Sequence, residues 1–208
     1  LNEIKMIIPW LINIGLKNYN VFDEIIIPLC TSNTQLSYAF FFECEFYMSD
    51  KILYHKLNNV MNSFLKKIDN QIKLSLYKTL DFVKFINENI FLKLSIVKWE
   101  REVNKWIQQN GPVKLPWDSS IECTGVVPEG IMVFNSATKP WKIPLIVKTQ
   151  SGEKIINILV KFEDVRKDKL TMIVSNFLQT VCKGILNINT YNVFPVCDNC
   201  GWIEMVEK

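Results

Sequence analysis

The feature that most constrains how this chain can fold is a change of hydrophobic pattern at Gly111-Pro112. Before this point, apolar residues recur at every third or fourth position, which is the spacing of helices that bury one face. The clearest series comprises Leu53, Leu57, Val60, Met61, Phe64, Leu65 and Ile68. After it, β-branched runs are separated by Pro, Gly and Ser, as in strands and turns. We therefore predict an α+β protein, with an all-α helical domain over residues 1–110 and a mainly β domain over residues 111–208.

Capping residues mark the helices of the first part. The segment from Ser32 to Gln35 predicts a capping box that opens a helix over residues 36–47. Ser49 or Asp50 should open the next helix. The Gly-Pro pair at the change of pattern should end the last one. Helices packed against one another are therefore expected throughout this part.

The second part is predicted to contain an antiparallel sheet and one long helix. The helix should run from about Asp168 to Lys183, bury one apolar face and end at Gly184. That face comprises Leu170, Ile173, Val174, Phe177, Leu178 and Val181. The predicted strands cover residues 131–134, 141–148, 155–162, 191–196 and 202–206. This order of strands around one helix is typical of the amino-terminal lobe of a kinase.

The composition excludes several classes of protein. Hydrophobic residues make up 49% and charged residues 22% of the chain, so a packed globular body is expected and not a disordered one. The net charge is only +3, and arginine occurs at positions 101 and 166 alone, so no nucleic-acid partner is predicted. The longest apolar runs fall far short of the roughly 20 residues that cross a bilayer.

The cysteine and histidine residues indicate neither a disulfide framework nor a metal site. Six cysteines at irregular spacing are expected to be free thiols in a reducing compartment, which predicts a cytoplasmic location. The pair Cys197-x-x-Cys200 has the spacing of half a zinc site. Its remaining partners would be Cys182, on a predicted buried helix face, and His55, in the other domain. No metal ligands are therefore predicted.

The segment from Lys161 to Asp168 is the most informative about function. It places one lysine at the end of an apolar strand and an acidic residue at the start of the next helix. A lysine that binds nucleotide phosphates needs this arrangement, because a carboxylate must hold its ammonium group where desolvation would otherwise be costly. By itself the pattern also suits a solvated lysine at the end of a strand.

At this segment the sequence resembles the phosphatidylinositol 3-/4-kinase family, and the resemblance extends over nearly the whole chain. Four motifs in the kinase-like part carry it: Asn135-Ser136-Ala137-Thr138-Lys139-Pro140-Trp141, similar to the family's phosphate loop; Asp164-Val-Arg166-Lys-Asp168 with Leu170-Thr-Met, similar to the segment that follows the strand lysine; Tyr191, similar to the back-pocket tyrosine; and Gly201-Trp-Ile203-Glu204-Met205-Val206, similar to the adenine-binding hinge. Residues 37–42 and 47–50 resemble the accessory helical domain that precedes this kinase domain.

The resemblance implies a fold and a subfamily. Residues 1–110 would form the helical accessory domain, and residues 111–208 the kinase amino-terminal lobe up to the hinge. The carboxy-terminal lobe would be missing, so the chain is expected to be a piece of a longer protein. Leu115-Pro116-Trp-Asp looks most like a type III alpha phosphatidylinositol 4-kinase, whereas Ala137-Thr-Lys-Pro would also suit a 3-kinase.

The resemblance also implies a reaction, the transfer of the ATP γ-phosphate to an inositol hydroxyl of a membrane lipid with the help of Mg²⁺. Lys161 would contact the α- and β-phosphates, with Asp168 orienting it, and Ser136 and Lys139 would cover the β/γ-phosphates. The backbone of the hinge would pair with adenine. The residues that the resemblance places at the nucleotide are Lys161, Asp168, Ser136, Lys139, Tyr191, Ile203, Glu204 and Val206.

The catalytic loop and the Mg²⁺ ligands are expected in the missing lobe, so no catalytic residue is predicted in this chain, and the fragment alone should be inactive. The expected partners are phosphatidylinositol in a membrane and regulatory protein subunits. The expected location is cytoplasmic and peripheral at membranes, at the plasma membrane for a type III alpha enzyme.

Two departures from the family's pattern leave an alternative open. The interval from Lys161 to Asp168 is one residue shorter than in the family, and Lys167 replaces a glutamine. A non-catalytic scaffold or pseudokinase is therefore the alternative from another class. If the shortened connection rotates the helix, Glu163 or Asp164 should replace Asp168 as the partner of the lysine.

Overall fold

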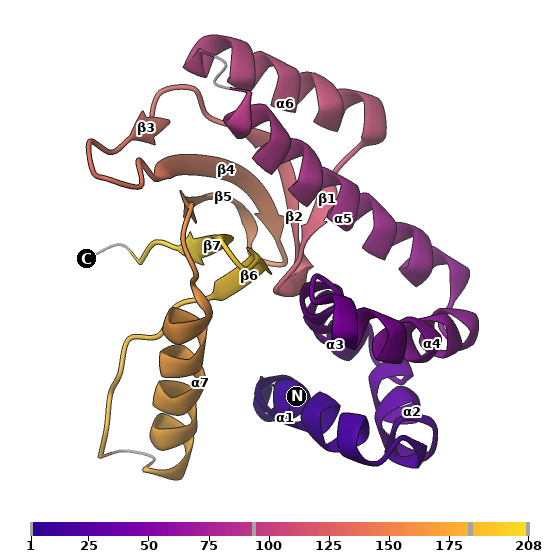
Figure 1. The fold of residues 1–208 in the computed structure, drawn as a ribbon. Helices are drawn as coiled ribbons and strands as arrows, with labels where there is room; N and C mark the ends of the chain where they lie inside the picture. Colours follow the sequence, from indigo (N-terminus) through magenta and orange to yellow (C-terminus); the bar gives the residue numbers. More distant parts are fainter. Residues whose placement is uncertain (1, 93–94, 183–184, 207–208) are drawn as a thin grey trace. The chain divides into compact units, whose positions relative to one another are not determined.

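The structure is a computed structural model that describes residues 2–92, 95–182 and 185–206. Within these residues, six α-helices and a short π-helix precede a sheet whose strand pairs are all antiparallel, and a seventh α-helix is inserted between two of its strands (Figure 1). The predicted succession of a helical region and a sheet in an α+β fold is therefore confirmed. The chain divides into two compact units, Leu1–Tyr77 and Lys78–Lys208, and the division falls within the helix α5 (Asn70–Phe91).

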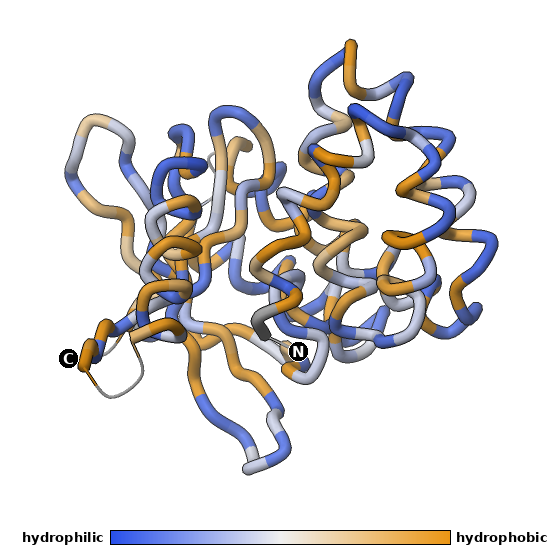
Figure 2. Tube along the Cα trace, turned by 90° about the horizontal axis from the view of Figure 1, so that it is seen from below, coloured by the Kyte–Doolittle hydropathy of each residue, from blue (hydrophilic) through white to orange (hydrophobic). Residues whose placement is uncertain are grey.

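From residue 2 onward, the first unit consists of helices and the short turns that join them. The elements that precede α5 are α1 (Asn2–Lys17), the π-helix η1 (Phe22–Ile26), α2 (Ile27–Thr31), α3 (Thr34–Tyr47) and α4 (Lys51–Lys67). Helix α3 is the most enclosed of them, since nine of its residues are buried. It packs against α1, α2 and α4, and the rings of Phe40 and Phe64 meet edge to face at 4.9 Å. In Figure 2 hydrophobic and hydrophilic positions alternate along the helical coils, as expected of helices that bury one face.

The sequence predicted the residues that cap the N-termini of α3 and α4. Asp50 caps α4 as predicted, because its Oδ1 accepts hydrogen bonds from the backbone of Ile52 and Leu53. The predicted capping box at Ser32 is wrong. Asn33 is the cap of α3, with its Oδ1 2.8 Å from the N atom of Gln35, whereas the hydroxyl of Ser32 donates to a carbonyl of the preceding helix.

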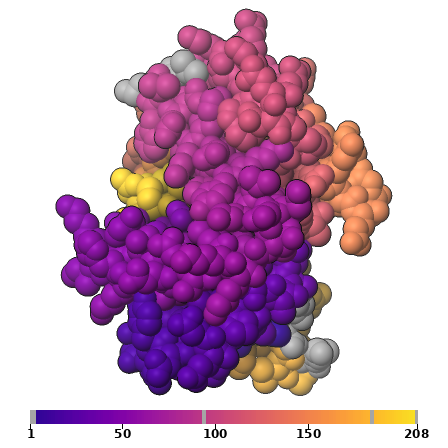
Figure 3. Space-filling view, turned by 90° about the vertical axis from the view of Figure 1, so that its right-hand side faces the viewer, coloured from indigo at the N-terminus to yellow at the C-terminus, as the bar shows by residue number. Residues whose placement is uncertain are grey.

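The second unit contains the rest of α5, α6 (Ile96–Asn110), the sheet and α7 (Arg166–Val181). The strands are β1 (Val113–Leu115), β2 (Asp118–Val126), β3 (Met132–Val133), β4 (Trp141–Thr149), β5 (Gly152–Lys161), β6 (Val193–Cys197) and β7 (Cys200–Glu204). Their order in the sheet is β1-β2-β4-β5-β7-β6, and β3 pairs with β4. The hairpin between β4 and β5, orange in Figure 3, projects from the surface of the unit, and its residues 150–155 are all exposed.

Two helices are tied to the sheet by side-chain hydrogen bonds. Asn104 of α6 bonds both the N–H and the carbonyl of Val126 on β2. Thr79 of α5 donates to the carbonyl of Lys114 on β1. Gly111 ends α6 as predicted, with φ of 77° and its N–H bonded to a carbonyl of the last turn. Among the described residues, no helix is both long and apolar enough to cross a membrane.

The sequence did not predict β1 and β2. The register of their pairing shifts between Lys114 and Leu115, and that of β2 with β4 shifts between Cys123 and Gly125. Bulges of this kind interrupt the alternation of polar and apolar residues on which strand prediction depends. The predicted strand over residues 131–134 is present only as the two residues of β3.

The prediction of a buried face on the long helix is wrong. No residue of α7 is buried, and the predicted core residues Leu170, Phe177 and Val181 are 54%, 51% and 64% exposed. The reason is that α7 packs against β6 and otherwise extends away from the sheet (Figure 1). The helix ends at Val181, and the predicted end at Lys183 and Gly184 lies outside the described residues.

Candidate functional site

Lys161 is the last residue of β5, opposite Gly201 of β7, and two carboxylates lie beside its ammonium group. Its Nζ is 2.8 Å from Oε1 of Glu163 and 3.9 Å from Oδ2 of Asp168. The hydrogen bond with Glu163 is the main cause of a raised pKa at Lys161, and electrostatic interactions with Asp168, Glu163 and Tyr191 also raise it, whereas partial burial lowers it. The lysine side chain is 24% exposed, so it is a protonated, accessible cation at the end of an apolar strand.

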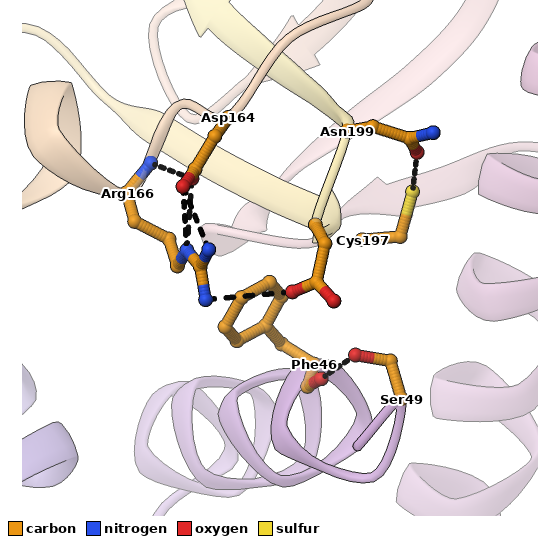
Figure 4. A network of polar contacts seen from close by, with 7 residues as sticks. Phe46, Ser49, Asp164, Arg166, Cys197 and Asn199 are labelled. Atoms are coloured by element: carbon orange, nitrogen blue, oxygen red, sulfur yellow. Dashed lines mark hydrogen bonds and ion pairs between the residues drawn. The ribbon is translucent and has the colours of Figure 1, made fainter.

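Asp164 is held by Arg166 instead of by Lys161 (Figure 4). The guanidinium of Arg166 donates to both carboxylate oxygens of Asp164, at 2.8 Å and 2.7 Å, and its backbone N–H donates to Oδ1 at 3.0 Å. These hydrogen bonds lower the pKa of Asp164 to about 2. Of the two residues considered as substitutes for Asp168, Glu163 is therefore the one beside the lysine.

Between these charged groups, Val165 is fully buried and anchors the start of α7. It forms an apolar cluster with Val193 and Ile203, against which Leu159, Met172 and Tyr191 are packed. A Cβ added to Gly201 would lie 2.1 Å from Cγ2 of Val165. The absence of a side chain at Gly201 therefore allows the β7 backbone to approach the β5–α7 connection closely.

Four of the predicted site residues thus lie in one region. Asp168 and Tyr191 each interact electrostatically with Lys161, and Tyr191 packs against the same apolar cluster that contains Ile203. The region thus combines a buried apolar cluster with a lysine held by two carboxylates.

The end of β7 is occupied by its own hydrogen bonds. The N–H of Glu204 donates to the carbonyl of Asn192 at 2.8 Å, and the Glu204 carboxylate accepts from the Asn192 side chain at 2.6 Å. Met205 donates to the carbonyl of Asn157. Val206, two residues after the end of β7, is 51% exposed. The N–H of Glu204 is therefore already engaged within the protein.

Ser136 and Lys139 lie on the exposed loop that joins β3 to β4. This loop is a tight turn in which the N–H of Lys139 donates to the carbonyl of Ser136, and Lys139 has φ of 43°. Within the described part of the chain, no hydrogen bond or ion pair joins this loop to Lys161. The register of β4 and β5 pairs Trp141 with Val160, so the loop that carries these two predicted phosphate-loop residues enters β4 beside the end of β5 that carries Lys161.

Sequence reasoning missed Asn87 of α5, which is 6% exposed. Its Oδ1 accepts a hydrogen bond from Nε1 of the fully buried Trp202 at 3.0 Å and lies 3.8 Å from Sγ of Cys200. Among the described residues its Nδ2 has no partner. A signal was present in the sequence, because Asn87 falls four residues after Val83 on the apolar stripe of α5.

The cysteines and the histidine do not form a metal site in the structure. Within residues 2–92, 95–182 and 185–206, no group of three or more His, Cys, Asp or Glu side chains could hold a metal ion. All six cysteines are free. His55 is exposed on α4, where its ring meets that of Tyr54.

Comparison with known proteins gives a partial similarity to a kinase. No model of a protein family matches the chain. Over 82 residues, the chain is 37% identical to the serine/threonine-protein kinase MEC1 of Kluyveromyces lactis, and the match covers 36% of this chain and 4% of that kinase. This similarity supports a relationship to kinases of the phosphatidylinositol 3-/4-kinase family, and it does not extend to the type III alpha subfamily.

Proposed function

We propose that the second unit is the nucleotide-binding part of an ATP-dependent kinase of the phosphatidylinositol 3-/4-kinase family. The observation that carries this proposal is the position of Lys161, whose ammonium lies 2.8 Å from Glu163 and 3.9 Å from Asp168 at the end of β5. The proposal is further supported by the four family motifs of the sequence and by the partial similarity to a protein kinase.

The role proposed for Lys161 follows from its surroundings. The transfer of a phosphoryl group depends mainly on positioning and on neutralising the charge of the phosphates. A lysine fixed by two carboxylates loses less conformational entropy when it meets a phosphate than a freely rotating one does. Leu159, Met172 and Tyr191 are partly buried and pack on the buried cluster of Val165, Val193 and Ile203, so they are the apolar side chains that a nucleotide base would contact.

ATP and Mg²⁺ are the proposed cofactors. In this proposal, Tyr191 and Ile203 lie on the side of the base, and the hinge from Glu204 to Val206 approaches its edge. Because the N–H of Glu204 is bonded to Asn192, pairing with adenine at this residue would have to use another backbone group. The residues that the structure describes contain no cluster of side chains able to hold Mg²⁺.

The substrate proposed from the family motifs is phosphatidylinositol, phosphorylated at the 4-hydroxyl, with the 3-hydroxyl as the alternative. Such a substrate would place the whole protein at the cytoplasmic surface of a membrane, with regulatory protein subunits as further partners. A second candidate, a serine or threonine of a protein, is favoured by the similarity to MEC1. In the complete protein, transfer of labelled phosphate to phosphatidylinositol vesicles or to a serine-containing peptide separates the two.

Nucleotide binding by the chain tests the site itself. Lys161→Met keeps the apolar stem and removes the charge, so the affinity for a fluorescent ATP analogue should fall by about 10- to 100-fold, as expected for the loss of about 1.5–3 kcal/mol from a hydrogen bond to a charged group. Lys154→Met is the matched control, because Lys154 lies on the same strand and is exposed. Equal affinities of the two variants, or no binding by the unaltered chain, would favour the scaffold.

A further inference from the structure

The β6–β7 hairpin carries two cysteines directly opposite one another at its tip. Cys197 and Cys200 are partners in the register of the two strands, and only Asp198 and Asn199 lie between them. Directly opposed residues of antiparallel strands have Cα atoms about 4.5–5.5 Å apart and side chains on the same face of the sheet. A disulfide requires Cα atoms about 4.4–6.8 Å apart. The backbone of this hairpin therefore suits a bond between the two cysteines.

The two thiols differ in their surroundings. Cys197 is partly exposed, and its thiol donates to Oδ1 of Asn199 at 3.0 Å (Figure 4). Cys200 is fully buried beside Asn87, and burial raises the pKa of its thiol to about 12. A reagent in solution would thus meet the sulfur of Cys197 first. The buried thiol is placed to act only after its neighbour has reacted.

We propose that Cys197 and Cys200 form a reversible redox pair, oxidised by the disulfide of a small thiol such as glutathione. The Cys197 thiolate attacks a sulfur of oxidised glutathione, which forms a mixed disulfide and releases one glutathione thiolate. Cys200 then loses its proton and attacks the sulfur of Cys197, which releases the second glutathione. Two protein thiols are oxidised, one glutathione disulfide is reduced to two thiols, and the hairpin gains one disulfide.

Two contacts connect this pair to the rest of the unit. Asp198, between the cysteines, lies 3.4 Å from the guanidinium of Arg166 at the start of α7. Cys200 shares the Asn87 oxygen with the indole N–H of Trp202. Formation of the disulfide would draw the Cys200 sulfur away from Asn87 and change the surroundings of the indole. Oxidation should therefore change the fluorescence of Trp202.

Mass spectrometry of the intact chain tests the proposal. The chain is equilibrated with defined ratios of oxidised to reduced glutathione, quenched with acid, alkylated and digested with trypsin. The peptide over residues 184–208 contains Cys197 and Cys200 and no other cysteine. With excess oxidised glutathione, this peptide should lose two hydrogens and take up no alkylating reagent, and dithiothreitol should restore two alkylation sites.

Variants distinguish this pair from other reactions of the thiols. Cys200→Ser should stop the reaction at a stable mixed disulfide on Cys197, and Cys182→Ser, which removes the other partly exposed cysteine, should leave the internal disulfide unchanged. Alkylation of both hairpin cysteines at every glutathione ratio would overturn the proposal. A mixed disulfide on Cys197 that persists in the unaltered chain, or a bond from Cys197 to Cys182 or to a second chain, would overturn it equally.

Discussion

Substituting Asn87 with alanine should destabilise the second unit through the hydrogen bond that it removes. Oδ1 of Asn87 is the acceptor for Nε1 of Trp202 at 3.0 Å, and Trp202 is fully buried. In Asn87→Ala the indole N–H loses its acceptor in a place that excludes water. An unpaired buried donor of this kind costs about 1–3 kcal/mol.

The magnitude depends on two smaller contributions. The truncation leaves a small cavity, which adds to the cost. It also removes Nδ2 of Asn87, a buried donor without a partner among the described residues, and this lowers the cost. We therefore expect Asn87→Ala to lower the free energy of unfolding by about 2 kcal/mol, measured by urea denaturation followed by far-ultraviolet circular dichroism.

A double-mutant cycle with Trp202→Phe isolates the hydrogen bond. When the indole N–H is absent, Asn87→Ala should cost about 1 kcal/mol less than in the unaltered chain. Trp99→Phe is the control, because Trp99 is also fully buried and its Nε1 has no partner in the described part of the chain. Additive effects of Asn87→Ala and Trp202→Phe, within about 0.5 kcal/mol, would refute the coupling inferred from the structure.

Three further predictions concern α7 and its connection to β5. Gly201→Ala should lower the free energy of unfolding of the second unit, measured by urea denaturation, because the new Cβ would lie 2.1 Å from Val165. Adding Val165→Ala should recover part of the lost stability, and no recovery would disprove this clash. Arg166 lowers the pKa of Asp164 from 3.8 to about 2, so this pair stabilises the fold above pH 3.8 and ceases to do so as the pH falls toward 2. In Arg166→Ala the pKa of Asp164, followed by carboxyl NMR, should return toward 3.8. An unchanged pKa would show that Arg166 does not cause the shift. Phe177→Ser should change the free energy of unfolding by less than about 0.5 kcal/mol, since Phe177 is 51% exposed; a cost of several kcal/mol would show that this helix face is covered.

Local sequence signals predicted the elements whose boundaries depend on neighbouring residues. Asp50 lies within reach of the free N–H groups of its own helix, and Gly111 adopts the positive φ that ends α6. Both effects act over only a few residues, so a pattern in the sequence is sufficient to find them. Where two capping residues were close together, as at Ser32 and Asn33, the backbone decided which one capped the helix.

Burial was decided by the tertiary structure. The apolar stripe of α4 is largely buried, with Leu57 and Phe64 inaccessible to solvent. A similar stripe on α7 is exposed, with Phe177 among its residues. Periodicity shows that a helix has an apolar face, but it does not show which other element covers that face. The bulges in β1 and β2 depended in the same way on pairing with strands elsewhere in the chain.

The candidate site shows the same division. The sequence alone placed a lysine at the end of an apolar strand and several acidic residues after it. Which carboxylate approaches Lys161 depends on the path of the backbone through the buried Val165, and this path brings Glu163 to 2.8 Å while Asp164 turns to Arg166. Asn87 meets Trp202 across 115 positions of sequence. No local pattern determines such a contact, because it forms only when helix and sheet pack together.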